Sequence, residues 1–171
     1  MNIKYITLLI CTFLISATAF SQYQDQDKKA IDKVISKLYR AISFDKGEGQ
    51  DREALKQIHY REAMVGMVDT TKIRMFTEDE FRETNQKAFK NAKITLFQER
   101  EINAITHVYG GVAMRFSSYE YRVKREDKER SVRGVNTIQL IKDPKQGWLI
   151  YSVIFSDTNS YPDLPDIYTK Q

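Results

Sequence analysis

Beyond Lys93 the sequence alternates between apolar and polar residues, and no other feature constrains the fold as strongly. β-Branched and aromatic residues fill four stretches in which the alternation persists, which is typical of strands. Only short glycine-rich or charged links separate them, whereas parallel neighbours need a connection of about a dozen residues. The strands must therefore pair antiparallel. They cover residues 94 to 108, 111 to 124, 130 to 142 and 147 to 156.

Three segments before this region have the patterns of helices. Apolar residues at helical spacing follow Asp27, and a second, shorter helix begins at Asp51, whose carboxylate can cap its first turn. Thr77 and Glu80 form a capping box that opens a third helix over residues 77 to 91. The apolar stripe of the first helix consists of Ile31, Val34, Ile35, Leu38, Tyr39 and Ile42.

The order of these elements predicts an α+β domain in which the helices cover one face of a curved sheet. The predicted strands are far longer than the usual five or six residues or so, so the sheet must coil rather than lie flat. Between the second and third helices, residues 64 to 68 are predicted to be extended and residues 69 to 72 to form a polar turn.

The first residues have the layout of a secretory signal. Lys4 precedes an apolar run over residues 5 to 19, and small residues at Ala19 and Ser21 favour cleavage before Gln22. The run is shorter than the roughly twenty residues of a spanning helix, so we expect export to the periplasm or medium without a stable membrane anchor. The predicted organisation is a signal peptide at 1–21, a domain at 22–158 and an extended C-terminal tail at 159–171.

Composition excludes several kinds of site. Cys11 is the only cysteine and lies within the predicted signal, so the mature chain has neither disulfides nor a cysteine nucleophile. His59 and His107 have no carboxylate at metal-binding spacing, and no metal or other cofactor is expected. The net charge is +4, but bases alternate with acids, as in residues 124 to 130, which indicates a solvated turn. Nucleic acid is not an expected partner.

Four motifs in the second half of the chain carry a resemblance to a known family. They are Gly110-Gly111-Val112-Ala113, the pair Tyr119 and Tyr121, residues 133 to 140 (RGVNTIQL) and residues 147 to 153 (GWLIYSV). In this order they resemble the nuclear transport factor 2-like superfamily, and within it the exported SnoaL-like proteins of bacteria. The resemblance implies a cone-shaped, cystatin-like fold with three N-terminal helices packed on a strongly bent antiparallel sheet. It also implies a pocket on the concave side and a homodimer formed through the convex side.

Polar residues within apolar strands are the best candidates for a pocket, because burying a polar group without a partner is costly. Asn136 shares its strand face with Ile138 and Leu140 and should point into covered space, for a ligand or for a hydrogen bond within the fold. Arg115 could bind an anion or lie at an exposed sheet edge. No catalytic residue can be assigned. The candidate pocket residues are Tyr39, His59, Tyr60, Met64, Met67, His107, Arg115, Tyr119, Asn136 and Tyr151.

Two functions remain open. We favour an exported, non-catalytic domain that binds a small apolar molecule or a protein partner, since no acid, base or nucleophile set is identifiable. The alternative is a small pocket enzyme of the isomerase, dehydratase or polyketide-cyclase type. In it an Asp or His would move a proton while a tyrosine or Asn136 binds the developing oxyanion.

Overall fold

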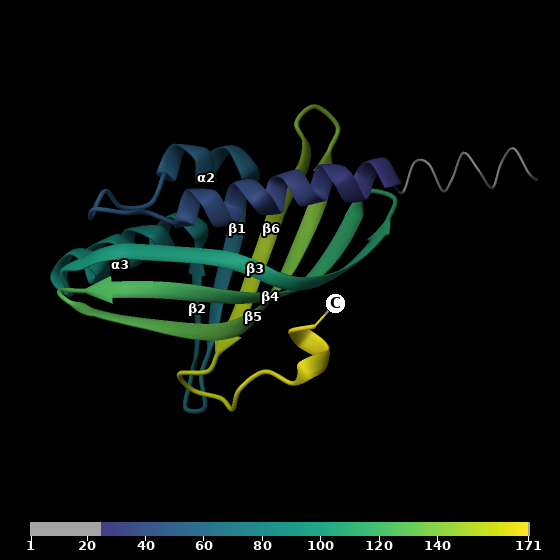
Figure 1. The fold of residues 1–171 in the computed structure, drawn as a ribbon. Helices are drawn as coiled ribbons and strands as arrows, with labels where there is room; N and C mark the ends of the chain where they lie inside the picture. Colours follow the sequence, from purple (N-terminus) through teal and green to yellow (C-terminus); the bar gives the residue numbers. More distant parts are fainter. Residues whose placement is uncertain (1–24, 171) are drawn as a thin grey trace, which may run out of the picture.

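The computed structural model describes residues 25–170, which form helices packed on one side of a bent sheet (Figure 1). The predicted signal peptide lies outside these residues. No helix in the described range is long and apolar enough to cross a membrane.

The sheet has six strands in the order β2-β1-β6-β5-β4-β3. All neighbouring pairs are antiparallel except β1 and β6, which run parallel. The expectation of a purely antiparallel sheet is therefore wrong, and the sheet is mixed. The strands are β1 (His59–Val68), β2 (Ile73–Thr77), β3 (Ile94–Tyr109), β4 (Val112–Arg125), β5 (Lys128–Asp143) and β6 (Gly147–Asp157).

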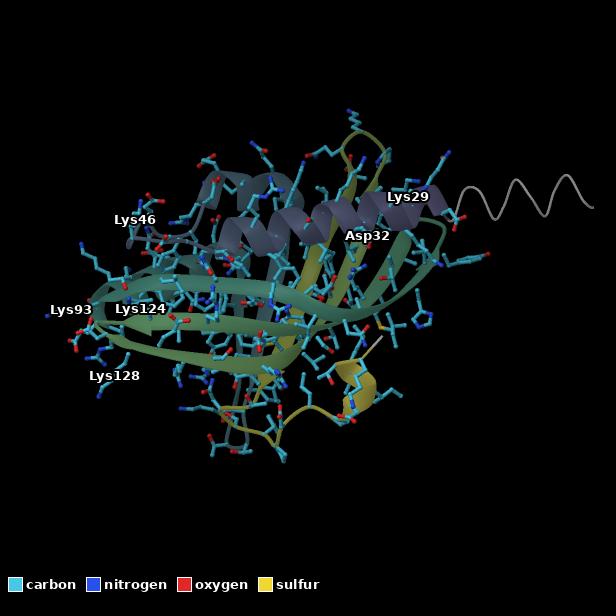
Figure 2. All side chains as sticks on the ribbon, viewed as in Figure 1. Lys29, Asp32, Lys46, Lys93, Lys124 and Lys128 are labelled. Carbon is cyan, nitrogen blue, oxygen red and sulfur yellow. The ribbon has the colours of Figure 1, made fainter. Side chains whose placement is uncertain are left out.

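The four long strands predicted after Lys93 are confirmed and differ from their expected limits by only a few residues. Gly110 and Gly147 adopt positive φ angles of 55° and 81° at two of the tight turns, a conformation that costs glycine little. Of the mixed-charge run at residues 124 to 130, only Glu126 and Asp127 form the turn between β4 and β5, and the rest belongs to the two strands. Lys128 of this run and the nearby Lys93 project into solvent at one end of the molecule (Figure 2).

The first part of the sheet was predicted incompletely. The short extended segment at 64 to 68 is the end of the ten-residue β1, and β2 was not predicted at all. β2 is only five residues long and ends at Thr77, which is also the cap of the next helix. The strong capping signal at its end therefore masked the weak strand signal before it.

The three predicted helices are present. Residues 25–42 form the N-terminal helix, α2 spans Arg52–Ile58, and α3 spans Glu78–Asn91. Asp51 accepts a hydrogen bond from the Ala54 N–H, and the capping box is complete. All three lie on the concave side of the sheet, as expected.

The core forms where the N-terminal helix packs on the concave face. Ile31, Ile35 and Leu38 of its stripe are almost fully buried together with Ile138 and Ile150 of the sheet. Burial of each such side chain contributes about 1.5–3 kcal/mol.

Side-chain contacts hold the two ends of the described chain. At the start of the N-terminal helix the buried Asp27 accepts hydrogen bonds from Trp148 Nε1 at 2.9 Å and from Lys142 Nζ at 2.7 Å. The tail after β6 ends in a short 3₁₀ helix, η1 (Asp166–Tyr168), and the ring of Tyr168 packs on Phe116 of β4. The tail is thus a strap across the sheet on the side away from the helices.

One close approach within the sheet requires glycine. A Cβ atom on Gly134 would overlap the hydroxyl of Tyr119 and lie 2.5 Å from the backbone oxygen of Ser156. The backbone oxygen cannot move without disturbing β6. We therefore predict that Gly134→Ala lowers the free energy of unfolding by about 1–3 kcal/mol. Urea denaturation checks this, with Gly111→Ala as the control, because its nearest neighbour would be a side chain at 4.0 Å. Equal stability of the two variants would contradict the prediction.

Candidate functional site

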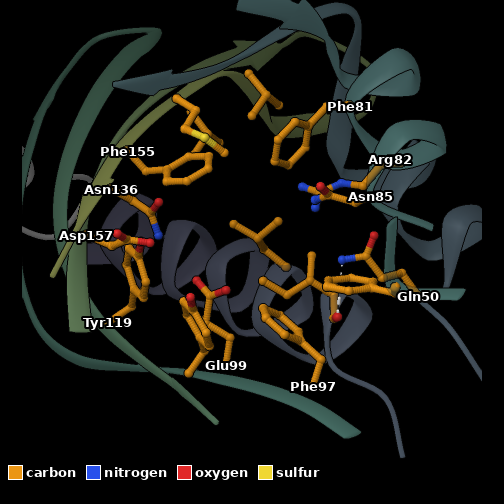
Figure 3. A pocket seen from close by; sticks show the side chains of 17 residues that line it. Gln50, Phe81, Arg82, Asn85, Phe97, Glu99, Tyr119, Asn136, Phe155 and Asp157 are labelled. Carbon is orange, nitrogen blue, oxygen red and sulfur yellow. Dashed lines mark hydrogen bonds between the residues drawn. The ribbon is translucent and has the colours of Figure 1, made fainter. Parts of the chain in front are cut away.

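A cavity of about 170 Å³ lies between the N-terminal helix, α3 and the concave side of the sheet (Figure 3). Aromatic and aliphatic side chains form much of its wall, among them Leu38, Phe81, Phe97 and Phe155. An apolar cavity of about 150 Å³ binds a molecule the size of benzene. This cavity therefore has room for a ligand built on about one ring.

Polar side chains gather at two ends of the cavity. Glu99, Asp157, Tyr119 and Asn136 come from the sheet, whereas Arg82 comes from α3 and lies across the cavity from them (Figure 3). One end therefore offers carboxylates and the other offers a guanidinium.

Glu99 is the group best suited to move a proton. The residue as a whole is only partly buried, but its carboxylate points into the cavity. Burial raises the pKa of this carboxylate to about 7, against the opposing effects of the Arg82 charge and a hydrogen bond from Asn136. Its position is also fixed, because its backbone N–H donates to Ser43 Oγ at 2.9 Å. Near neutral pH both the acid and the base form are therefore present.

A chain of hydrogen bonds orients Asn136 behind the cavity wall. Its Nδ2 donates to the Tyr39 hydroxyl at 3.1 Å, and that hydroxyl lies 2.7 Å from Ser117 Oγ. Ser117 donates to a Glu101 oxygen at 2.5 Å, and both Glu101 oxygens accept hydrogen bonds from Arg115. Because the Glu101 carboxylate can only accept hydrogen bonds, every donor in this series of hydrogen bonds points away from the cavity. Asn136 is thereby held with its amide group as a donor.

Tyr119 supplies a hydroxyl group to the cavity. The residue is 3% exposed, and its hydroxyl makes no hydrogen bond to any other residue between 25 and 170. Burial raises its pKa, and the negative charges of Glu99 and Asp157 raise it further. The hydroxyl therefore stays protonated and can donate a hydrogen bond to a ligand.

Arg82 and Glu78 form a buried ion pair on α3. Arg82 Nε lies 2.6 Å from Glu78 Oε1, one helical turn away, and both side chains are less than one tenth exposed. The Arg82 guanidinium also lies over the ring of Phe81, 5.1 Å from its centre. This pair holds the Arg82 guanidinium in place at the wall of the cavity.

The structure brings four of the predicted pocket residues together. Met67, Tyr119 and Asn136 line the cavity, and Tyr39 is buried directly behind Asn136. Asn136 thus lies in covered space, as expected from its strand face, and also forms the internal hydrogen bond considered as the alternative.

The two predicted histidines lie outside the cavity. His59 is buried next to α2, where its Nδ1 lies 2.8 Å from the Leu55 carbonyl oxygen, and burial lowers its pKa. Tyr60 is beside it. His107 and Tyr151 lie on the convex face of the sheet, because their strand positions alternate with the inward ones. Neither histidine can therefore act on a ligand in the cavity.

The remaining candidates are also placed elsewhere. Met64 lies on the opposite face of β1 from Val65 and Met67, which line the cavity. Arg115 is 8% exposed, so it does not lie at an exposed sheet edge. Its guanidinium forms ion pairs with Glu101 and Asp32 and is therefore not available to bind an anion. The aspartate Asp69 cannot serve as the base either, because it sits in the turn between β1 and β2, where hydrogen bonds from Thr71 lower its pKa to about 2.

The sequence reasoning missed Glu99, Arg82 and Asp157. Glu99 follows Phe97 by two residues in a strand and so shares its inward face, a signal that was available. Arg82 follows Phe81 in a helix whose pattern reads as an ordinary charged surface, and only packing shows that it is buried. Among residues 25–170, no group of three or more His, Cys, Asp or Glu side chains could hold a metal ion.

No family model matches the sequence, and no curated protein matches it. Solved structures do match. A nuclear transport factor 2-like superfamily protein from Salmonella enterica has a TM-score of 0.63 and 19% identity, covering 78% of this chain and 92% of that protein. A similar protein with a cystatin-like fold from Novosphingobium aromaticivorans has a TM-score of 0.65 and 14% identity, with coverages of 85% and 91%.

A third match is a proposed dehydratase of the same family from Streptomyces avermitilis, with a TM-score of 0.61, 16% identity, and coverages of 83% and 99%. The fold of this chain is therefore the nuclear transport factor 2-like fold, which confirms the resemblance at the level of the fold. Whether the chain is of the exported SnoaL-like type stays a prediction.

The raised pKa of Glu99 predicts a pH-dependent stability. Below the ordinary pKa of 4.5 the group is protonated in both states, whereas above about 7 the folded state must bury a charged carboxylate. Folding stability is therefore lost as the pH rises through this window, by about 3 kcal/mol. Glu99→Gln does not titrate, so its unfolding free energy relative to the original protein should rise by that amount across the window. Urea denaturation at several pH values measures it, and a constant difference would contradict the assignment.

Proposed function

We propose that the cavity is the active site of a small enzyme that transfers protons on a compact carbonyl compound, with Glu99 as the acid and base. The observation that carries this proposal is a carboxyl group with a pKa of about 7 that points into a cavity with aromatic and aliphatic side chains in its wall. Catalytic acids and bases work best when their pKa lies near the working pH. Perturbed carboxyl groups of this kind cluster at active sites.

The reaction follows from the groups present. The Glu99 carboxylate removes a proton from a carbon next to the carbonyl group, and the electrons of that C–H bond move onto the carbonyl oxygen. The Tyr119 hydroxyl, which has no partner in the described structure, donates a hydrogen bond to the enolate oxygen. Where a carbon–carbon double bond adjoins the deprotonated carbon, the protonated Glu99 returns the proton to the far carbon of that bond, which moves the double bond into conjugation with the carbonyl group and isomerises the compound. If a hydroxyl leaves from the next carbon instead, the same proton completes a molecule of water.

Non-catalytic binding of a small molecule is the second candidate function. The sequence favoured it because no base could be identified, and Glu99 removes that reason. The apolar wall of Leu38, Phe97 and Phe155 is the observation that still supports it, since a ring-sized apolar guest needs nothing more. Among proteins with this fold, the proposed dehydratase supports the catalytic function proposed first.

The two functions are separated by an exchange experiment. The mature protein is incubated in deuterium oxide with a panel of one-ring ketones and β-hydroxy ketones, and ¹H NMR follows deuterium exchange, isomerisation and loss of water. We expect catalysed exchange with at least one compound. In Glu99→Gln the exchange rate should fall by at least about 100-fold. Glu120→Gln is the control, because Glu120 pairs with Arg100 and Arg133 outside the cavity. Binding without exchange, or equal rates in all three proteins, would favour the non-catalytic function.

We further propose that the mature chain begins at Gln22, is exported, and forms a homodimer through the convex face of the sheet. On that face Tyr109, Val112 and Met114 are 77%, 58% and 47% exposed. The C-terminal strap packs beside them on Phe116 and leaves them uncovered. A second copy is the occupant we propose, because an apolar sheet face exposed to water promotes association.

One measurement tests both export and dimer formation. Native mass spectrometry of protein recovered from the bacterial periplasm should show twice the mass of a chain that starts at Gln22. Met114→Glu should shift the population to monomers, because it places charges in the apolar contact. Gln86→Glu adds the same charge on exposed α3 and should remain dimeric. A full-length mass would contradict cleavage, and a monomer at micromolar concentration would contradict the dimer.

A further inference from the structure

The Arg82 guanidinium at the cavity wall has hydrogen-bond donors that no residue of the described range accepts, and the Gln50 Oε1 atom in the same wall also lacks a partner. The Arg82 Nε–H is used by Glu78, but neither terminal nitrogen donates to any residue in the described range 25–170. The residue is 6% exposed, and Figure 3 shows the guanidinium at the cavity wall. A buried guanidinium whose terminal nitrogens face a cavity needs an acceptor there.

The opposite end of the cavity is better satisfied. Both carboxylate oxygens of Asp157 accept hydrogen bonds at 2.9 Å, one from the backbone N–H and one from the side-chain amide of Asn159. Glu99 accepts from Asn136. The demand for a ligand group is therefore for an acceptor at Arg82, rather than for a cation at the acidic end.

The charges around Arg82 limit what that acceptor can be. Glu78 neutralises part of the guanidinium charge, and Glu99 and Asp157 face it across the cavity. A planar carboxylate still fits, because the two terminal nitrogens of a guanidinium match its two oxygens and form charge-assisted hydrogen bonds. Neutral acceptors make weaker bonds of this kind.

We propose that Arg82 binds the carboxylate of a small, one-ring organic acid, whose apolar body lies along Phe81 and Phe97 and whose reactive carbon faces Glu99. The inference rests on the proposed function in that it takes this cavity as the substrate site, and it adds the substrate class. The substrate is then a small carbonyl acid or hydroxy acid, and Arg82 sets its orientation. The volume of about 170 Å³ suits a ligand built on one ring.

Three one-ring probes of similar size test the proposal: benzoate, benzamide and benzylamine, each titrated by calorimetry into the mature protein. We expect benzoate to bind at least about tenfold more tightly than the other two. One additional charge-assisted hydrogen bond accounts for an affinity ratio of this size. Tighter binding of benzylamine would overturn the proposal, since the acidic end would then dominate. Equal binding of benzoate and benzamide would also overturn it.

Variants of the ion pair show whether Arg82 is the contact. Glu78→Gln removes the competing anion and leaves Arg82 in place, so benzoate should bind several-fold more tightly, whereas a purely structural Arg82 would leave the affinity unchanged. Either single variant, Glu78→Gln or Arg82→Gln, leaves a buried charge without its ion partner, which lowers stability, so circular dichroism checks that each is folded. The double variant Glu78→Gln/Arg82→Gln avoids this and should lose the preference for benzoate over benzamide. Arg100→Gln is the control, because Arg100 is exposed and pairs with Glu120.

Glu99→Gln separates this inference from the proposed function. That variant should lose proton transfer and still bind benzoate, because it keeps Arg82. Loss of exchange in Glu99→Gln together with no preference for benzoate would overturn the substrate class and leave the reaction standing. A preference for benzoate without any exchange in the original protein would support the carboxylate site at Arg82 and overturn the proposed reaction.

Discussion

The N-terminal helix packs against only part of the concave face of the sheet, and the rest of the structure depends on this incomplete cover. Ile31 and Ile35 pack into the core, and Asp27 holds the start of the helix through Trp148 and Lys142. Leu38 and Ile42, near its end, already line the cavity. A bent sheet cannot be filled along its whole length by one straight helix, so the space under the bend remains for α3 to enclose.

Enclosure by α3 determines the chemistry of that space. Phe81 and Phe89 line its wall, and the packing of α3 buries Arg82 beside them. Low solvent access raises the pKa of Glu99 and strengthens every charge interaction nearby. The same burial costs folding free energy, which the packing of the helices must offset. Sites that hold a perturbed carboxyl group commonly trade stability for function in this way.

Much of the fold could be predicted because it depends on periodicity and local capping. The alternation after Lys93 identified the four long strands, and the Thr77 capping box identified α3. The parallel pairing of β1 with β6 could not be predicted, because these strands are far apart in the sequence and no local signal reports their register. β2 was missed because a five-residue strand beside a strong helix signal has too short a pattern to recognise.

The candidate site shows which features the sequence determines and which depend on the tertiary structure. Sequence alone determined that the chain is an α+β protein with a curved sheet, and strand alternation alone turned Asn136 inward. Only the tertiary structure decided that Glu99 and Arg82 share a cavity, and that His59, His107 and Arg115 lie outside it. The physical reason is that side-chain direction follows from local backbone geometry, whereas burial and charge pairing depend on which distant elements pack together.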